Sequence, residues 1–540
     1  MSDAASVDRK AADTEAADRA WRPRGNPWLI AVVVTLAAFM EILDTTIINV
    51  SLPHIAGAMS VSYDDATWTL TSYLVANGIV LPVSGFLGRL LGRKRYFLIC
   101  IAMFTVCSFL CGISDNLVEL VVFRLLQGFF GGGLQPNQQS IILDTFEPAQ
   151  RGRAFSVVAV AVIVAPVIGP TLGGWITDTY TWRWIFLINI PVGIVAFFAV
   201  TALVEDPPWI RREQSLRQHV DYIGLALIAL GLGCLQVMLD RGEDNDWFGS
   251  AFIRVFAALA VLGISGAIVW LLTTRQPIVN LRAFADRNFA VGCVMIFGFG
   301  AVLYSSAVLL PQLAQQRLGY TATLAGLILS PGGLVIIALI PLVSRVLLPN
   351  VQTRFIIMFG FVSLGCALLY ARTLAPDVDF TTLGLMRAAQ TFGLAFLFVP
   401  NSTITYSTLP RELNGDGSAL YVMLRNVSGS IGISLSTAMV TEQSQVEQAH
   451  LVQYMTPLWQ PYDDTLRAIA GSVQSLGHTY AQAQHSATDM MFTTLMQQAA
   501  IKAYGNVFEI CAIAAFCVAP VALLFRASKS GAPQGAPAAH

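Results

Sequence analysis

Runs of about 20 apolar residues recur along almost the whole chain, separated by short segments rich in Gly, Pro and charged residues. A helix of that length crosses a hydrocarbon core of roughly 30 Å. Taking the polar segments as boundaries, we predict fourteen transmembrane helices, at residues 28–52, 67–87, 96–113, 118–142, 154–176, 184–204, 220–240, 251–273, 289–311, 323–345, 354–373, 381–402, 418–440 and 505–526. Because the number is even, both termini are expected on the same side of the membrane.

The composition agrees with this pattern. The chain is 55% hydrophobic and 12% charged, whereas soluble domains are about a quarter charged. All eight cysteines lie in apolar segments, so we expect them to behave as small hydrophobic side chains, with no disulfide framework and no metal site. Most of the 32 Lys and Arg residues lie in loops on the side of the termini. The positive-inside rule therefore predicts a multi-pass membrane protein with both termini in the cytoplasm.

A short pattern occurs twice. The fourth and twelfth predicted helices each carry Arg-x-x-Gln followed by Pro-Asn, at Arg124, Gln127, Pro136 and Asn137, and at Arg387, Gln390, Pro400 and Asn401. Both arginines lie about six residues into a span, which favours an internal repeat of two six-helix halves with substrate bound between them. The predicted divisions are a tail at 1–27, a bundle at 28–204, a linker with two inserted helices at 205–288, a bundle at 289–526 that includes an outer loop at 441–504, and a tail at 527–540.

Two glycine-rich segments predict close helix contacts. The hairpin after the second span, residues 85–95, combines small residues with a basic cluster: Gly85, Gly88, Gly92 and Arg93. The fifth span contains Pro166, Gly169, Pro170, Gly173 and Gly174. Small residues let helices approach and Pro removes a backbone donor, so we expect this span to be kinked and tightly packed on a neighbour.

Together these segments resemble the major facilitator superfamily, specifically its fourteen-helix drug:proton antiporter branch and the EmrB-like group. LDTTIINV at residues 43–50 resembles the helix 1 motif of that branch, the hairpin resembles its loop motif, Arg124 with Gln127 and Gly128 resembles its helix 4 motif, and the fifth span resembles its antiporter motif. The resemblance implies an all-α integral membrane fold, a location in the inner (cytoplasmic) membrane, and alternating access.

It also implies a function: efflux of lipophilic drugs or toxic compounds, driven by a proton gradient and without a cofactor. The partners implied are the lipid bilayer, small lipophilic substrates, protons, a periplasmic membrane-fusion adaptor and an outer-membrane channel, and no nucleic acid. One position departs from the wider superfamily, where Asp stands in place of Arg89. A gate that depends on that Asp is not carried over to this chain.

Two acids in the first span need explanation, because a carboxylate at mid-membrane costs about 2.5 to 3.5 kcal/mol. Glu41 and Asp44 are three residues apart on one helix, so we expect them to share a face directed at protein or water. Three interpretations are open: a structural ion pair of Asp44 with Arg124, a proton-coupling site, and a binding charge at Glu41 for a cationic substrate. Asp44 is favoured for coupling or pairing, and Glu41 for substrate preference.

Other polar residues within the spans are possible cavity residues: Asn49, Tyr304, Arg387, Gln390, Tyr421, Arg425 and Asn426. Arg387 is expected to be structural, by analogy with Arg124, and Arg425 is placed to meet an anionic substrate. The polar segment 441–504 is interpreted either as a solvated spacer or as a docking surface, with amphipathic helix within 487–503.

The alternatives are an exporter of a metabolite or siderophore on the same scaffold and, outside this class, a membrane-embedded enzyme, an ATP-driven pump or a channel. The enzyme and the ATP-driven pump are disfavoured because the sequence has no HExxH, no GxSxG and no phosphate-binding Gly-Lys-Ser/Thr loop.

Overall fold

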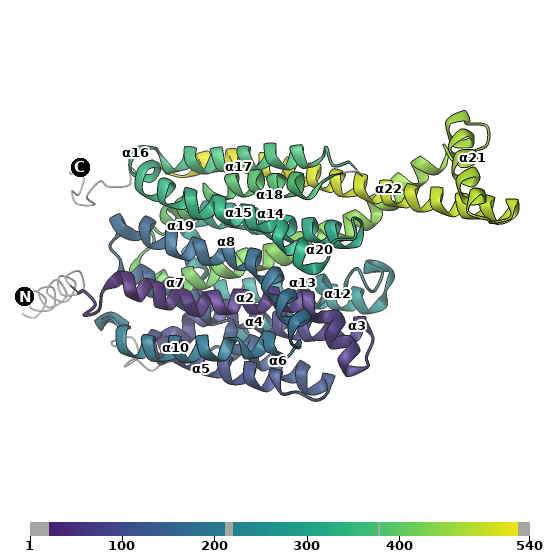
Figure 1. Ribbon diagram of the computed structural model, residues 1–540. Coiled ribbons are helices and arrows are strands. Elements are labelled where there is room, and N and C mark those ends of the chain that lie inside the picture. The colour runs from purple at the N-terminus through teal and green to yellow at the C-terminus, as the bar shows by residue number, and fades with distance from the viewer. Residues whose placement is uncertain (1–20, 211–219, 376–377, 527–540) are drawn as a thin grey trace, which may run out of the picture.

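The computed structural model describes residues 21–210, 220–375 and 378–526, and every regular element within them is helical. The helices lie side by side in one elongated bundle (Figure 1). Most of both predicted tails and part of the predicted linker, residues 211–219, lie outside the described residues.

The helices follow the predicted spans closely. In the first part of the chain they are α2 (Pro27–Met59), α3 (Tyr63–Ala66), α4 (Trp68–Leu91), α5 (Arg93–Gly112), α6 (Leu117–Gly131), α7 (Leu134–Thr145), α8 (Pro148–Thr179), α9 (Trp184–Leu187) and α10 (Asn189–Leu203). Two further helices follow, α12 (Tyr222–Arg241) and α13 (Ala251–Thr273). The last part comprises α14 (Arg287–Gln316), α15 (Ala322–Leu342), α16 (Leu348–Asn350), α17 (Thr353–Ala371), α18 (Phe380–Ala395), α19 (Phe398–Thr405), α20 (Asn414–Val452), α21 (Gln460–Ser475) and α22 (Tyr480–Val518).

Short helices of other types also occur. The 3₁₀ helices are η1 (Trp247–Gly249), η2 (Leu281–Ala285), η4 (Arg411–Leu413) and η5 (Ala519–Leu524), and η3 (Val343–Leu347) is a π-helix. We call the end of the bundle at which α2 begins and η5 finishes the basal end. The opposite end, from which α20 and α22 project, is the distal end (Figure 1).

Thirteen helical segments of the described chain are long and apolar enough to cross a membrane. The predicted span 418–440 is not among them, although it forms the middle of the continuous helix α20. This helix packs against α14 and α4, in the interior of the bundle. A helix shielded from lipid by its neighbours does not need an apolar surface, which explains its many Ser, Gly and Asn residues.

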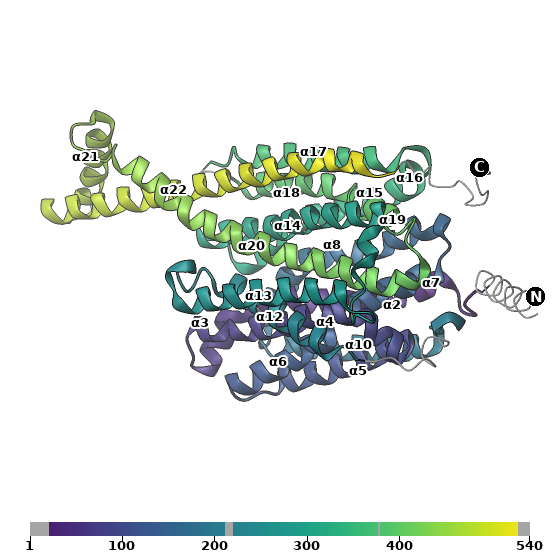
Figure 2. The same cartoon turned by 180° about the vertical axis from the view of Figure 1, so that it is seen from behind.

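The helices form two groups that meet along the bundle. In the first group α2 packs on α8 and α10, and α4 packs on α6; in the second, α14 packs on α20 and α17 on α22. The groups touch where α8 lies against α15 and where α4 lies against α20. Helices α12 and α13 pack on each other, and α12 also lies on α4, as seen from behind in Figure 2.

The repeated pattern has a structural counterpart. The fourth predicted span is broken at Gly132 and Gly133 into α6 and α7, and the twelfth is broken at Phe396 and Leu397 into α18 and α19. In both cases the Arg-x-x-Gln residues precede the break and Pro-Asn follows it. The two segments therefore share a shape as well as a sequence.

The predicted close packing of the fifth span is present. Helix α8 continues through Pro166 and Pro170, and a Cβ atom added at Gly169 would lie 2.1 Å from Oγ1 of Thr46 on α2. A Cβ at Gly173 would lie 2.9 Å from the carbonyl oxygen of Ile47. These glycines hold α2 and α8 in backbone contact.

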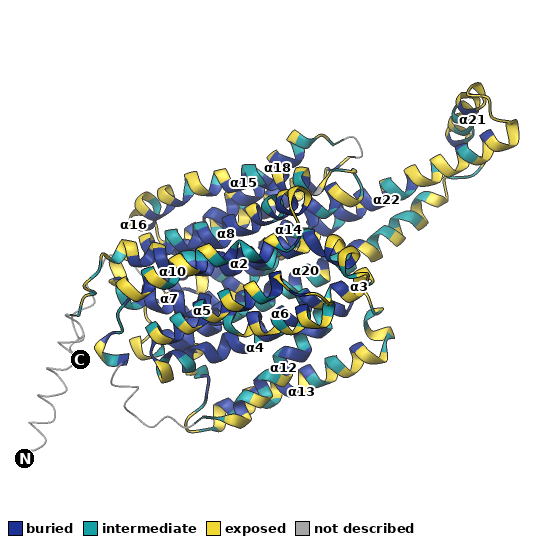
Figure 3. Ribbon diagram, turned by 60° about the horizontal axis from the view of Figure 1, so that its bottom comes forward, coloured by how far each residue is buried: buried dark blue, intermediate teal, exposed yellow. Residues whose placement is uncertain are grey.

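The polar segment 441–504 is helical for most of its length, including the stretch 487–503 where helix was predicted, and the long helices extend well beyond the predicted spans. Helix α20 continues to Val452 and α22 begins at Tyr480, so that each has 39 residues. At 1.5 Å per residue such a helix is about 58 Å long, roughly twice the hydrocarbon thickness. The two helices and α21 form a projecting hairpin that is mostly exposed (Figure 3). Hydropathy located the end of the apolar run, and the helix continues beyond it through polar residues that favour helix.

Candidate functional site

Asp44 is at the centre of a buried ion pair. Its Oδ2 atom accepts a hydrogen bond of 2.6 Å from Nη1 of Arg124, and both side chains are at most 1% exposed. The other oxygen, Oδ1, accepts bonds from Gln127 at 3.1 Å and from Asn189 at 2.8 Å. Helices α6 and α10 thus supply every partner, and the carboxylate is both charge-compensated and fully hydrogen-bonded.

Arg124 is held from several directions. Its Nε atom donates to the carbonyl oxygen of Thr69 at 3.1 Å, and its guanidinium lies 4.2 Å from the ring centroid of Tyr73. The ring of Phe186 lies on another side, at 5.6 Å. A Cβ at Gly128 would lie 2.3 Å from the carbonyl oxygen of Tyr73, so this glycine lets α6 approach α4 closely enough for these contacts.

Glu41 has a different set of partners. It accepts hydrogen bonds from the hydroxyl of Tyr73 at 3.1 Å, from the amide of Asn77 at 3.0 Å, and from the amide of Gln135. All three donors are neutral, and Glu41 is 2% exposed. The two acids are therefore one turn apart but belong to separate networks, which share only Tyr73.

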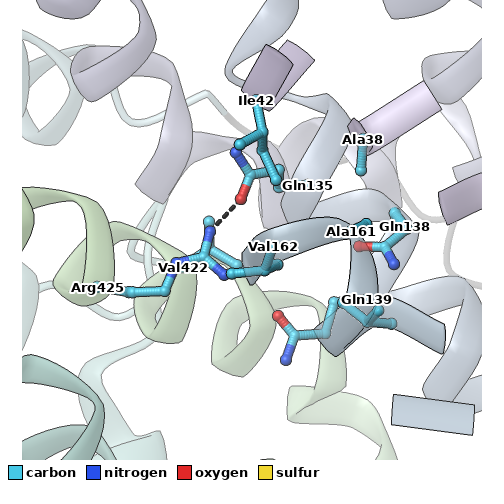
Figure 4. A pocket seen from close by; sticks show the side chains of 10 residues that line it. Ala38, Ile42, Gln135, Gln138, Gln139, Ala161, Val162, Val422 and Arg425 are labelled. Carbon is cyan, nitrogen blue, oxygen red and sulfur yellow. Dashed lines mark hydrogen bonds between the residues drawn. The ribbon is translucent and has the colours of Figure 1, made fainter. Parts of the chain in front are cut away.

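Gln135 connects the two groups of helices. Its amide nitrogen donates to Glu41 and its amide oxygen accepts from Nη2 of Arg425 on α20. Arg425 and Gln135 point toward one another across a small cavity (Figure 4). The cavity is lined by Ala38, Ile42, Gln135, Gln138, Gln139, Val158, Ala161, Val162, Val422 and Arg425, from α2, α7, α8 and α20.

The hairpin motif holds the basal end together. Arg89 on α4 pairs with Asp416 on α20 at 2.5 Å. A Cβ at Gly85 would lie 2.8 Å from the carbonyl oxygen of Gly415, so the two backbones are in contact there. The absence of Asp at position 89 therefore does not remove a contact between the groups. In this chain the base stands on α4 and the acid on α20.

The remaining motif residues stabilise the hairpin itself. Gly92 has a φ of 86°, a conformation that L side chains rarely adopt, and it separates α4 from α5. Arg93 forms a buried ion pair with Asp144 and donates to the carbonyl oxygen of Ser140 at 3.0 Å. Gly88 lies near Arg93, 3.9 Å from its Cγ when a Cβ is added.

Arg387 corresponds to Arg124 by the repeat but has different partners. Its Nη1 atom donates to the hydroxyl of Ser306 on α14 at 3.0 Å and lies 3.4 Å from Oε1 of Gln390. Arg387 and Gln390 are both 0% exposed. Among the described residues, no carboxylate oxygen lies within 4.0 Å of this guanidinium.

Some of the other predicted cavity residues lie together. Asn426 accepts from Nε of Arg425 at 3.3 Å, and Tyr304 packs against Gly429 and interacts with Arg425. Tyr421 is buried and its hydroxyl accepts from Asn401 at 2.9 Å, toward the basal end of α20. Asn49 is exposed, so it does not join the buried network around Asp44.

Several residues of these networks were not predicted, namely Tyr73, Asn77, Gln135, Asn189 and Asp416. Tyr73 and Asn77 are four residues apart on α4, and therefore lie on one face. That spacing of polar residues in an apolar span was a usable signal. Gln135 carried no such signal, because three other polar side chains surround it on α7, at Asn137, Gln138 and Gln139.

Comparison with known proteins agrees with this architecture. Residues 34–433 match the Major Facilitator Superfamily. The multidrug export protein EmrB of Escherichia coli K12 is 38% identical over 456 residues, which cover 84% of this chain and 87% of EmrB. The fatty acid resistance protein FarB of Neisseria gonorrhoeae is 35% identical over 480 residues, covering 89% and 92% of the two chains.

The fold is also that of solved transporters. The proton:xylose symporter XylE, solved with 6-bromo-6-deoxy-D-glucose, superposes with a TM-score of 0.56 at 14% identity, covering 90% of this chain and 94% of XylE. These comparisons define the class as a multi-pass membrane transporter rather than an enzyme. The chain belongs to the major facilitator superfamily.

Proposed function

We propose that this protein exports lipophilic drugs or toxic compounds across the inner membrane in exchange for protons, by alternating access, with its basal end in the cytoplasm. Glu41 is the acid that exchanges a proton for substrate, and Asp44 is the acid that holds Arg124 in place. Both termini are then cytoplasmic, and the proton gradient is the energy source.

The observation that carries this proposal is the difference between the partners of the two acids. Asp44 is in a direct ion pair with a buried guanidinium. Among the described residues Glu41 accepts from neutral donors only, and Gln135 lies between it and both Arg425 and the cavity between the two groups of helices. A carboxyl group that is not in a direct ion pair can gain and lose a proton without leaving a buried cation unpaired, as an exchanging group must.

Exchange follows from competition at one group. A proton entering from the distal side neutralises Glu41 and releases a bound lipophilic cation, and the next substrate from the basal side displaces the proton. One proton crossing about 150 mV releases about 3.5 kcal/mol, at about 2.3 kcal/mol per 100 mV. At about 1.4 kcal/mol per tenfold, this supports a gradient of a few hundredfold for a neutral compound. One-for-one exchange with a monovalent cation moves no net charge, so it draws on the pH difference alone.

The test is transport of a panel of cationic and neutral dyes in inside-out membrane vesicles, with and without a pH gradient. For Glu41→Gln we expect loss of gradient-driven transport, while dye binding to the purified protein remains measurable for neutral dyes. Glu41→Asp is the matched control and keeps part of the driven transport. Normal pumping by Glu41→Gln would show that Glu41 is not the exchanging acid.

We further propose that the projecting hairpin, residues 441–504, docks a periplasmic adaptor that leads to an outer-membrane channel. Support comes from its reach beyond the membrane-spanning region and from exposed apolar side chains at its tip, where Leu458 is 96% and Leu476 is 80% exposed. The arms of the hairpin are braced below the tip, where Asn506 donates to Glu447 at 3.0 Å.

This second proposal is tested by replacing residues 454–478 with a short Gly-Ser turn, which leaves the brace between α20 and α22 in place. We expect normal transport in vesicles, and loss of drug resistance in cells that have two membranes. A matched control replaces only Leu458 and Leu476 with Ser. Full resistance with the shortened hairpin would argue against docking at the tip.

A further inference from the structure

The second buried arginine has hydrogen-bond donors that no group of the described protein accepts. Arg387 uses Nη1 for Ser306 and Gln390, but its Nε and Nη2 atoms and the amide nitrogen Nε2 of Gln390 have no acceptor. These donors come from side chains one turn apart on α18. Both side chains are fully buried.

The first half of the molecule shows a carboxylate at the corresponding side chains. Arg124 and Gln127 hold the same relation on α6, and the carboxylate of Asp44 accepts from Nη1 of the arginine and from the amide nitrogen of the glutamine. Nε of Arg124 donates to the carbonyl oxygen of Thr69, while its Nη2 atom, like that of Arg387, has no acceptor in the described protein. In the second half the residue that takes the place of Asp44 as acceptor is Ser306, on α14, whose own hydroxyl donates to the carbonyl oxygen of Leu303 at 3.1 Å. Serine has a hydroxyl group where aspartate has a carboxylate, so its side chain is smaller as well as uncharged.

A buried guanidinium with unpaired donors is energetically unfavourable unless a further group pairs with it. A buried cation without a counter-charge costs several kcal/mol, and each unpaired buried donor adds about 1 to 3 kcal/mol. Arg124 has the rings of Tyr73 and Phe186 beside it as well as Asp44. Among the described aromatic residues, none lies over Arg387.

We propose that Arg387 and Gln390 bind a small monovalent anion, with chloride the abundant one, in the place that the Asp44 carboxylate takes in the other half. The site is distinct from the network of Glu41 and Gln135, and it does not depend on the proposed exchange of protons for drug. Its enclosure favours a compact ion over an organic carboxylate.

The experiment is thermal unfolding of the purified wild-type protein in sodium chloride, bromide, gluconate and benzoate at equal ionic strength. We expect the midpoint to be roughly 2 to 4 °C higher in chloride and bromide than in gluconate or benzoate. Ser306→Asp supplies the missing carboxylate, so its midpoint in gluconate should match that of the wild type in chloride and should not respond to chloride. Ser306→Ala, which adds neither a charge nor a larger side chain, should keep the response.

A wild-type midpoint that is the same in all four salts overturns the proposal. An equal chloride response in Ser306→Asp overturns it too, because it shows a general salt effect, and equal stabilisation by benzoate excludes an enclosed site for a small ion. If Ser306→Asp does not fold, binding of radioactive chloride to the wild type decides the question. Saturable binding that bromide displaces and Arg387→Gln lacks supports the site, and absence of such binding overturns it.

Discussion

The two halves of this transporter each bury an arginine at the same position of a broken fourth helix, and they neutralise it differently. Arg124 is paired with Asp44 inside the chain, through a bond of 2.6 Å. Within the described residues, Arg387 meets only the hydroxyl of Ser306 and the amide oxygen of Gln390. The two halves therefore share the backbone shape and the cation, whereas the described residues supply a counter-charge to Arg124 and none to Arg387.

The two arginines illustrate two kinds of buried polar group in the membrane, one that stabilises the fold and one that is open to ions or ligands. A buried charge with every partner supplied by its own half makes that half rigid, since any movement breaks several bonds at once. A buried charge with few protein partners leaves its environment free to respond to ions or ligands. We expect the first half to act as the more rigid frame and the second half as the more responsive one.

The largest effect is expected when the first half is made to resemble the second. Asp44→Ser leaves Arg124 buried without its carboxylate, and removing one partner of a buried pair costs about 3 to 5 kcal/mol. We expect a much lower thermal midpoint and a small yield of folded protein, measured by fluorescence-detected size exclusion. Ser306→Ala in the other half is the control and should lose little. Equal stability of the two variants would remove the distinction between the halves.

A smaller effect is expected where the halves hold each other. Arg89→Asp places two acids together at the basal end, next to Asp416. We expect transport in vesicles to fall about tenfold, which corresponds to about 1.4 kcal/mol, because the basal closure of the transport cycle is weakened. The double variant Arg89→Asp with Asp416→Arg should recover most of the rate. Failure of the exchanged pair to recover it would mean that the two charges are not coupled.

The smallest effect is expected when a single amide side chain is replaced in each half. Gln127→Leu removes a donor from the Asp44 carboxylate, whose bond is 3.1 Å long, and should cost about 1 to 3 kcal/mol because a buried acceptor loses its partner. Gln390→Leu removes an amide that donates to no protein group, and should cost less than about 1 kcal/mol in gluconate. Both values come from thermal unfolding. A larger cost for Gln390→Leu in that salt would contradict the assigned difference.

Much of the fold followed from sequence because apolar runs report lipid exposure directly. The span predicted at 251–273 coincides with α13, which faces outward and is among the least buried helices. The prediction was poorest for α20 and α22, where the helix continues into water. Hydropathy reports whether side chains prefer lipid or water. The length of a helix also depends on helix propensity and on packing between the two arms of the hairpin.

For the candidate site, the sequence could supply the depth of each polar residue in the membrane. Asp44 and Arg124 lie at similar depths on the first and fourth predicted spans, and their pairing could be anticipated from that. The bond from Arg425 to Gln135 and the pair of Arg89 with Asp416 join residues 290 and 327 positions apart. Such contacts depend on how the two groups of helices are docked, which no local pattern encodes.

The projecting hairpin has a mechanical consequence. About 25 residues of α22 precede the predicted last span, a rod of about 38 Å at 1.5 Å per residue. The rod is continuous with a helix of the second group, so a tilt of about 10° in that group would sweep the far end through roughly 6 to 7 Å. A rearrangement of side chains deep in the membrane would thus be converted into a displacement of several ångströms at the tip of the hairpin outside it. The hairpin would then act as a lever, and a partner bound at its tip would be displaced in each transport cycle.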